Sequence, residues 1–264
     1  NHIKRYEPTI TSYDYCAPIT EWGDYTDTYH KIRKLLCEKQ NLPMEDLPAP
    51  PVMQNIGTVS LTESADLFEN LDNIAQKHYS PLPRNMESYG QNFGLIYYVT
   101  KLKGNYDAGF LSIDDVHDYA HVYYENKKIA TINRCKEKSL INKLKLKKQL
   151  FVKGTSSESE IGVLVEGMGR VNYGAKLKDA KGITQGIGFG NNFVYHWKNY
   201  PLPFDDVSKV DFKEGVAPFD GTPVLLKAEI EISERCDTFI KLPTFKKGII
   251  IVNNKVLSRH WEVG

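Results

Sequence analysis

Short apolar segments separated by turn residues fill most of this 264-residue chain, and they constrain its fold more than any other feature. Turn pairs such as Glu125-Asn126 and Asn253-Asn254 stand between them and suit tight hairpins. Many short strands without intervening helices favour β-sandwiches or jelly rolls, so the sequence predicts a mainly β fold. We expect strands at residues 57–62, 93–100, 108–113, 119–124, 128–133, 149–152, 161–165, 193–197, 224–232, 238–242, 248–252 and 256–261.

Two segments differ from this pattern because their apolar residues recur at helical spacing. One helix is predicted to follow Asp24 or Thr26, either of which can serve as an N-cap, and to end near Lys39. The second helix candidate covers residues 65–78. Between them, residues 42–52 contain four prolines and acidic residues, which is typical of a linker along the surface.

Composition excludes several classes of protein. A hydrophobic content of 41% with 25% charged residues indicates a soluble protein with a real core, and a net charge of +1 gives no field for nucleic acid. The alternating Lys and Leu residues at 143–148 are best explained as a solvated strand face. No apolar run approaches the roughly 20 residues that span a bilayer. The four cysteines form no CxxC pair, which excludes a zinc ribbon but leaves both disulfides and free thiols open.

Near the start of the chain, a β-branched run leads into Tyr13-Asp14-Tyr15, and a proline turn and the first predicted helix follow. This order is typical of a βα unit. In barrel enzymes, ligands are held at the carboxyl end of the strand in such a unit. The loop is therefore a candidate binding site.

Six segments in order resemble the glycoside hydrolase family 35 β-galactosidases. The first is Thr-Ser-Tyr-Asp-Tyr at residues 11–15, where Cys16 replaces the Asp of the family's motif. The closest match is Val-Glu-Gly-Met-Gly-Arg-Val-Asn-Tyr-Gly at residues 165–174. The other similar segments are Tyr-Gly-Gln-Asn-Phe-Gly at 89–94, Val-His-Asp-Tyr-Ala-His-Val at 116–122, Trp-Lys-Asn-Tyr-Pro-Leu at 197–202 and Asp-Thr-Phe-Ile at 237–240, and the similarity continues from Lys247 to Trp261.

This resemblance implies a retaining glycosidase that releases terminal β-galactose. Tyr15 is expected to contact the sugar, because a phenol can both donate and accept a hydrogen bond while its ring covers an apolar sugar face. Tyr13 and Asp14 are expected to hold the loop in shape. The family's two catalytic glutamates lie on earlier barrel strands, so no catalytic residue, metal or cofactor is expected in this chain. The family's members lean towards a lysosomal or secreted location, while oligomerisation stays open.

The resemblance also suggests a domain plan. Residues 1–40 would be the last βα unit of a TIM barrel, 41–84 a linker with a strand and a short helix, 85–203 a first jelly-roll sandwich, and 204–264 part of a second, galactose-binding-like domain. On this plan the chain is truncated at both ends, and it should be inactive alone. The alternative is a carbohydrate-binding or scaffolding protein built from the family's β modules without catalysis.

Other motifs have simpler explanations. His117 and His121 have the spacing of a helical metal pair, but the alternation around them predicts strands. The glycines at 186–190 are not followed by a helix, so we expect a turn or bulge there and not a phosphate site. Residues 168–173 should be structural, with Arg170 bracing the β module against the barrel through a carboxylate or backbone carbonyls.

Overall fold

The computed structural model describes residue 6 and residues 15–136, 148–154, 157–172, 174, 177–218 and 220–263. Its chain forms two compact units. Unit 1 comprises Asn1–Thr9, Leu61–Lys227 and Lys247–His260, and unit 2 comprises Ile10–Ser60, Ala228–Lys246 and Trp261–Gly264.

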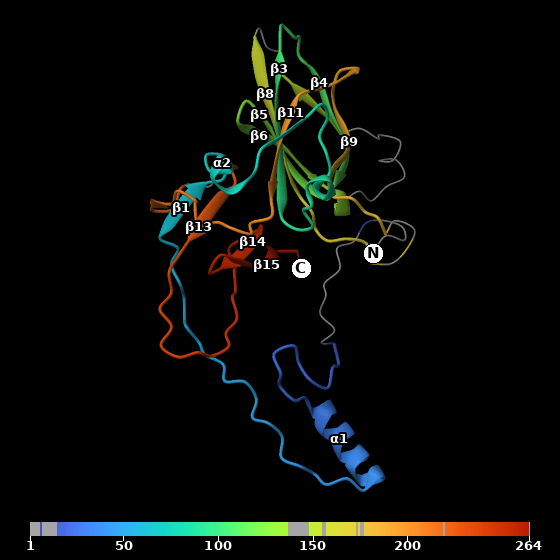
Figure 1. The fold of residues 1–264 in the computed structure, drawn as a ribbon, viewed down its shortest axis with the longest axis vertical. Helices are drawn as coiled ribbons and strands as arrows, with labels where there is room; N and C mark the ends of the chain where they lie inside the picture. The colour runs from blue at the N-terminus through green and yellow to red at the C-terminus, as the bar shows by residue number, and fades with distance from the viewer. Residues whose placement is uncertain are drawn as a thin grey trace. The chain divides into compact units, whose positions relative to one another are not determined.

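The secondary structure is mainly β, as expected, and Figure 1 labels its main elements. In chain order the elements are α1 (Asp27–Gln40), β1 (Glu63–Asp66), α2 (Leu71–Ile74), β2 (His78–Ser80), η1 (Met86–Tyr89), β3 (Leu95–Lys103), β4 (Gly109–His117), β5 (Tyr119–Tyr124), β6 (Lys127–Asn133), η2 (Arg134–Lys136), β7 (Lys148–Val152), β8 (Glu158–Glu166), β9 (Gly182–Phe189), β10 (Asn192–Phe193), β11 (Trp197–Leu202), β12 (Lys213–Glu214), β13 (Val224–Lys227), β14 (Lys247–Val252) and β15 (Lys255–Trp261).

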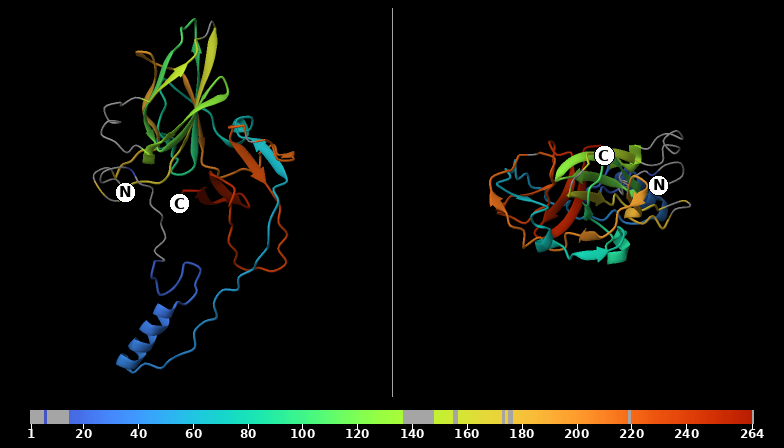
Figure 2. Two further views of the ribbon diagram at one scale, coloured as in Figure 1. Left: turned by 180° about the vertical axis from the view of Figure 1, so that it is seen from behind. Right: turned by 90° about the horizontal axis from the view of Figure 1, so that it is seen from above.

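Unit 1 contains a β-sandwich. Its larger sheet has the order β2-β11-β3-β8-β5-β6, and its smaller sheet has the order β10-β9-β4-β7. The two sheets form the two layers seen in Figures 1 and 2. Alternate residues of both sheets meet in one core, among them Ile96 and Tyr98 from β3, Ile187 from β9 and Trp197 from β11. The predicted sandwich is confirmed.

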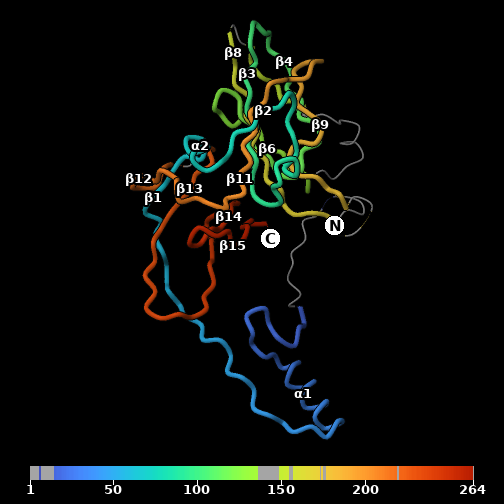
Figure 3. Tube along the Cα trace, viewed as in Figure 1, coloured from blue at the N-terminus to red at the C-terminus, as the bar shows by residue number. Residues whose placement is uncertain are grey.

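The central strands of the larger sheet are buried on both faces, which explains why β3 is an almost continuous apolar run and not an alternating one. Tyr97 and Val99 of β3 point away from the sandwich core and join a second apolar cluster. Leu67 and Leu71 from the segment after β1 and Ile249 from β14 also belong to this cluster. Two smaller sheets, β12-β1-β13 and the hairpin β14-β15, are traced in Figure 3.

Several predicted elements are confirmed. The strand at 119–124 coincides with β5, and α1 begins after Thr26, whose hydroxyl accepts a hydrogen bond from the backbone N–H of Tyr29. The hairpin pairs Glu125-Asn126 and Asn253-Asn254 all have positive φ, as a tight turn of this kind requires. The residues predicted as a linker, 42–52, contain neither helix nor strand.

Other predicted elements are wrong. Residues 65–78 hold β1, the four-residue α2 and β2 in place of one helix, because β1 pairs with β12 and β13. Residues 57–62 form no strand, since pairing starts at Glu63, and residues 238–242 form none, since the local bridge joins Asp237 to Met53. The strand expected at 193–197 is β10 and the start of β11.

The glycine-rich segment also needs a correction. Gly186 and Gly188 lie inside β9, and Gly190 alone of the three lies in a turn. A Cβ at Gly186 would lie 2.9 Å from the ring of Phe193, and one at Gly188 would lie 2.8 Å from the hydroxyl of Ser112. The glycines are therefore explained by close side-chain approach within the sheet.

Candidate functional site

The predicted sugar loop lies at the start of the part of unit 2 that the structure describes. Tyr15 is 85% exposed, and Cys16 is an exposed free thiol. Tyr13 and Asp14 lie outside the described residues. The role of Tyr15 in sugar contact stays a prediction, and its exposure leaves the phenol accessible to a ligand.

The N-terminus of α1 holds the loop that follows Tyr15. The Thr26 hydroxyl donates to the carbonyl oxygens of Ala17 (3.2 Å) and Pro18 (2.9 Å), while Thr26 N–H also donates to Pro18 (3.0 Å). Ile19 forms a β-bridge with Tyr25. One N-cap residue therefore starts the helix and fixes the direction in which the chain leaves the candidate loop.

A cluster of four buried charged residues lies in unit 1 and was not predicted from the sequence. Arg134 forms two hydrogen bonds with Asp179 (2.8 and 3.0 Å) and one with Asp118 (2.6 Å). The Lys181 ammonium contacts the same two carboxylates, at 2.7 Å from Asp118 and 2.5 Å from Asp179. Two positive and two negative charges balance, which allows them to be buried.

The electrostatics of the cluster follow from these contacts. Burial alone would raise the pKa of Asp179, but the hydrogen bonds from Arg134 and Lys181 lower it to about 2. His117 approaches the cluster from one side, with Nε2 3.0 Å from Asp115 and Nδ1 2.6 Å from the Ala180 carbonyl oxygen. The hydrogen bond with His117 lowers the pKa of Asp115 below its ordinary range.

Tyr6 completes the cluster. Its side chain is 3% exposed, and its hydroxyl donates to the Gly169 carbonyl oxygen at 2.6 Å. The centre of its ring lies 4.4 Å from the Arg134 guanidinium carbon and 4.6 Å from the Lys181 ammonium. Burial and the Asp118 carboxylate raise the pKa of Tyr6 well above its ordinary value, so the phenol stays protonated.

The motif at residues 168–173 contributes backbone groups to this cluster. The Met168 N–H donates to Asp118 at 2.8 Å, and Gly169, which has a φ of +103°, provides the carbonyl oxygen that Tyr6 contacts. Arg170 binds the Glu87 carboxylate and donates to the Asn92 carbonyl oxygen, so its observed partners are a carboxylate and a carbonyl of unit 1. These contacts give the motif a structural role, as predicted.

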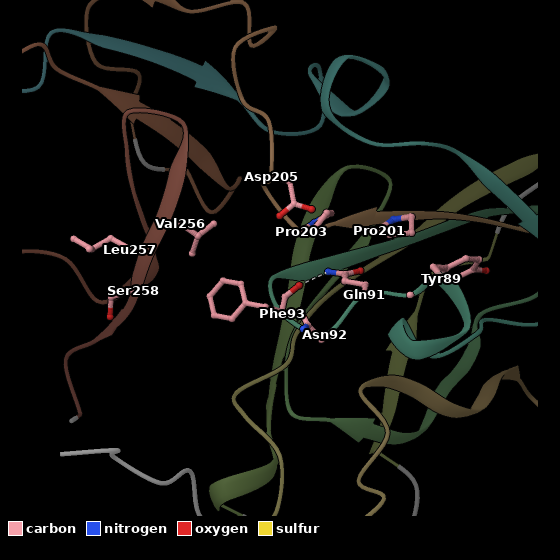
Figure 4. A pocket seen from close by; sticks show the side chains of 11 residues that line it. Tyr89, Gln91, Asn92, Phe93, Pro201, Pro203, Asp205, Val256, Leu257 and Ser258 are labelled. Atoms are coloured by element: carbon pink, nitrogen blue, oxygen red, sulfur yellow. Dashed lines mark hydrogen bonds between the residues drawn. The ribbon is translucent and has the colours of Figure 1, made fainter. Parts of the chain in front are cut away.

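A cleft of about 500 Å³ lies in unit 1 (Figure 4). Asp205 is the one acidic residue among the described residues that line this cleft. The cleft therefore has no pair of carboxyl groups for acid–base chemistry. The Gln91 amide nitrogen donates to the carbonyl oxygens of Phe93 and Leu95, both at 2.7 Å. The described lining residues are Tyr89, Gly90, Gln91, Asn92, Phe93, Pro201, Pro203, Asp205, Val256, Leu257 and Ser258.

The histidine pair lies on strands, as predicted. His117 ends β4 of the smaller sheet, while His121 lies on β5 of the larger sheet and contacts the Thr131 hydroxyl at 3.0 Å. Across the described parts of the chain, no three His, Cys, Asp or Glu side chains are grouped as metal ligands. None of the four cysteines, which all lie in the described ranges, forms a disulfide. None of the helices in the described ranges is long and apolar enough to cross a membrane. Residues 143–147 of the Lys/Leu segment lie outside these ranges.

Sequence reasoning missed the charged cluster because its members are far apart in the chain. Tyr6 and Gly169 are separated by 163 positions, and Lys181 by 63 positions from Asp118. The available signal was indirect, since Asp118 and Gly169 each lie within a segment that resembles the family.

Comparison with known proteins supports the resemblance over the whole chain. Residues 83–203 match the family model described as beta-galactosidase, first all-beta domain. Beta-galactosidase 8 from Oryza sativa subsp. japonica is 29% identical over 97% of this chain and 43% of the relative. Beta-galactosidase from Xanthomonas manihotis is 29% identical over 100% of this chain and 42% of the relative, and Beta-galactosidase-1-like protein 2 from Homo sapiens is 29% identical over 100% and 41%.

The chain therefore spans about two fifths of the length of these relatives. Its matches to β-galactosidases extend across both structural units. The resemblance to the family 35 β-galactosidases is confirmed, and residues 83–203 match the model of the first all-beta domain.

Proposed function

We propose that this chain is the non-catalytic part of a retaining β-galactosidase that removes terminal β-galactose from galactosides. The observation that carries the proposal is the similarity to β-galactosidases over 97–100% of the chain. Residues 1–40 would contribute the last βα unit of the catalytic barrel, with Tyr15 as a sugar contact. Both catalytic glutamates would come from the part of the enzyme that precedes this chain.

The chemistry of the reaction supports this division. A retaining glycosidase needs two carboxyl groups about 5 Å apart, one as acid and base and one as nucleophile. Asp118 and Asp179 are neighbours, but both are buried and share Arg134 and Lys181 as partners. Neither carboxylate can reach a sugar without breaking these ion pairs. The cluster therefore serves stability and not catalysis.

The proposal is tested first on the chain alone. Residues 1–264 are expressed, their fold is verified by circular dichroism, and hydrolysis of an aryl β-galactoside is measured. We expect no turnover above a blank. Turnover that a substitution within the chain abolishes would contradict the proposal, and galactose binding by the chain alone would favour the carbohydrate-binding alternative.

The sugar contact is tested in the longer enzyme that carries this chain. Tyr15→Ala should raise KM for the aryl galactoside about tenfold or more, because a hydrogen-bonding and stacking partner of the sugar is lost. Tyr79→Ala is the matched control, since Tyr79 is also exposed and lies on β2 of unit 1. Equal kinetics for both variants would remove Tyr15 from the site.

A further inference from the structure

The cleft in unit 1 is formed by three segments that are distant in the sequence (Figure 4). Residues 89–93 extend from the end of η1 towards β3, residues 201–205 continue from the end of β11, and residues 256–258 belong to β15. The volume of about 500 Å³ lies within the range of sites for small molecules. All three segments belong to unit 1, so the cleft lies within one compact unit.

Two side chains of the β14-β15 hairpin hold this wall of the cleft to the rest of unit 1. In the turn, the Asn254 side chain accepts from the Val207 N–H at 2.6 Å and donates to the Asp206 carboxylate at 3.0 Å. On β15, the Arg259 guanidinium donates to the Gly167 carbonyl oxygen at 3.1 Å. The walls are therefore connected by hydrogen bonds before any ligand enters, which lowers the cost of ordering them on binding.

One polar group at the cleft lacks a partner among the described residues. Gln91 is 5% exposed, and its amide nitrogen, which Figure 4 shows turned towards Phe93, donates to the carbonyl oxygens of Phe93 and Leu95. These two bonds fix the orientation of the amide, since an oxygen in the place of the nitrogen would face two acceptors. The buried Oε1 accepts no hydrogen bond from any described residue. A ligand that brings a hydroxyl donor to Gln91 therefore adds a hydrogen bond that these residues do not make.

The residues that line the cleft decide the class of ligand. No Lys, Arg or His is among the described lining residues, so an anion such as phosphate has no cation to bind. Asp205 provides one carboxylate, which is too few for a calcium or magnesium site. Phe93, Pro201 and Pro203 provide apolar ring surfaces, and the Asn92 amide adds a donor and an acceptor. This combination suits a neutral sugar, whose C–H faces pack on rings while its hydroxyl groups form hydrogen bonds.

We propose that this cleft binds a chain of neutral sugar units. The Phe93 ring covers the apolar face of one unit, the Asp205 carboxylate and the Asn92 amide bind hydroxyl groups, and Gln91 Oε1 accepts from a further hydroxyl. A monosaccharide fills only part of the cleft, so free galactose should bind too weakly to be measured. This inference goes beyond the proposed function and does not rest on it, because it concerns sugar units other than the terminal galactose.

Binding is tested on the 264-residue chain with neutral tetrasaccharides that contain no galactose, built from glucose, mannose or xylose. Calorimetry should give a Kd on the order of 1 mM or lower for at least one of them. Asp205→Ala removes a charged acceptor and should weaken this binding about tenfold. Phe93→Leu keeps an apolar side chain without the flat ring, and it should weaken binding about fivefold. Asp107→Ala is the matched control, since Asp107 is also exposed and lies between β3 and β4.

The place of binding is read from the side-chain amide signals of Gln91 and Asn92 in the nitrogen-15-labelled chain, which should shift during the titration. Absence of binding by all three sugars overturns the proposal, and so does binding that shifts neither signal or that both variants leave within twofold of the wild type. If Phe93→Leu does not fold by circular dichroism, Asp205→Ala decides, because its position is exposed. None of the probes is a β-galactoside, so failure here leaves the turnover test of the proposed function unaffected.

Discussion

The two units of this chain treat their apolar residues differently. In unit 1 the central strands of the larger sheet are covered on both faces, and two apolar clusters bury residues from β3 to β9 and from β11. In unit 2 the apolar side of α1 is not covered: the helix has no buried residue, and Ile32, Leu35 and Leu36 are each more than 40% exposed. The apolar residues of unit 1 therefore pack against other residues of unit 1. The apolar face of α1 packs against no residue within the described part of unit 2.

This difference fits the proposed division of the enzyme. A helix with an apolar stripe normally buries that stripe against a neighbouring element. In the proposed barrel, α1 would be the outer helix of the last βα unit and would bury this face on the barrel strands. Substitutions in unit 1 should consequently affect the stability of this chain far more than matched substitutions in unit 2.

The largest difference is expected for buried against exposed apolar side chains. Trp197 is fully buried in the sandwich core and donates from its indole nitrogen to the Val194 carbonyl oxygen at 2.7 Å. Trp197→Ala should lower the free energy of unfolding by about 4 kcal/mol, whereas Leu35→Ala should lower it by less than about 0.5 kcal/mol. Urea denaturation followed by circular dichroism measures both values. Equal losses would contradict the comparison.

Two glycines with positive φ sharpen the comparison. A Cβ at Gly94 would lie 2.2 Å from the Leu202 carbonyl oxygen of β11, while a Cβ at Gly57 in unit 2 would meet nothing within 4 Å. Gly94→Ala should therefore cost more than about 3 kcal/mol, since strain and backbone displacement add, and Gly57→Ala only about 1 kcal/mol from strain. If thermal unfolding shifts equally in the two variants, the close approach of β11 to Gly94 is wrong.

Removing one charge from the cluster should be nearly as severe. Asp179→Asn leaves an excess positive charge buried with Arg134 and Lys181, which we expect to cost about 3 kcal/mol at neutral pH. The pKa of Asp179 is about 2 in the folded protein against 3.8 ordinarily, so its stabilising contribution is complete above about pH 4 and is lost as the pH falls towards 2. The difference between wild type and variant should shrink across this window. A difference independent of pH would show that the carboxylate is not held as described.

The smallest expected effect concerns His121. Burial, together with the positive charges of Lys128 and Lys247, lowers its pKa from 6.5 to about 4. The unfolded chain therefore binds a proton first, and stability falls as the pH decreases from 6.5 to 4. His121→Gln should flatten the stability curve in this range. The same slope in the variant would assign this dependence to another group.

Local rules predicted most of the sandwich. The β-branched and aromatic residues of β3, β5 and β8 predicted strands near their observed positions. The pair Asn253-Asn254 predicted the turn between β14 and β15. Thr26, as a possible N-cap, predicted where α1 begins. The strand β9 was missed because its glycines lower strand propensity, although close side chains require them.

The candidate site was less predictable for a physical reason. The buried charged cluster around Tyr6 brings together residues from distant parts of the chain. Such a cluster has no signature in residue spacing or periodicity. Asp179 and Lys181, for example, are two positions apart on a loop whose sequence is typical of a polar surface segment. Tyr15 was predicted as a sugar contact only from the motif at residues 11–15.

The proposed function requires that this chain lack the carboxyl pair of a retaining β-galactosidase. A fluorinated, mechanism-based galactoside forms a stable ester with the nucleophile of a retaining glycosidase, and intact-mass measurement detects the added sugar. We predict that the mass of the 264-residue chain stays unchanged after incubation with this reagent. A stoichiometric adduct on an Asp or Glu of the chain would contradict the account.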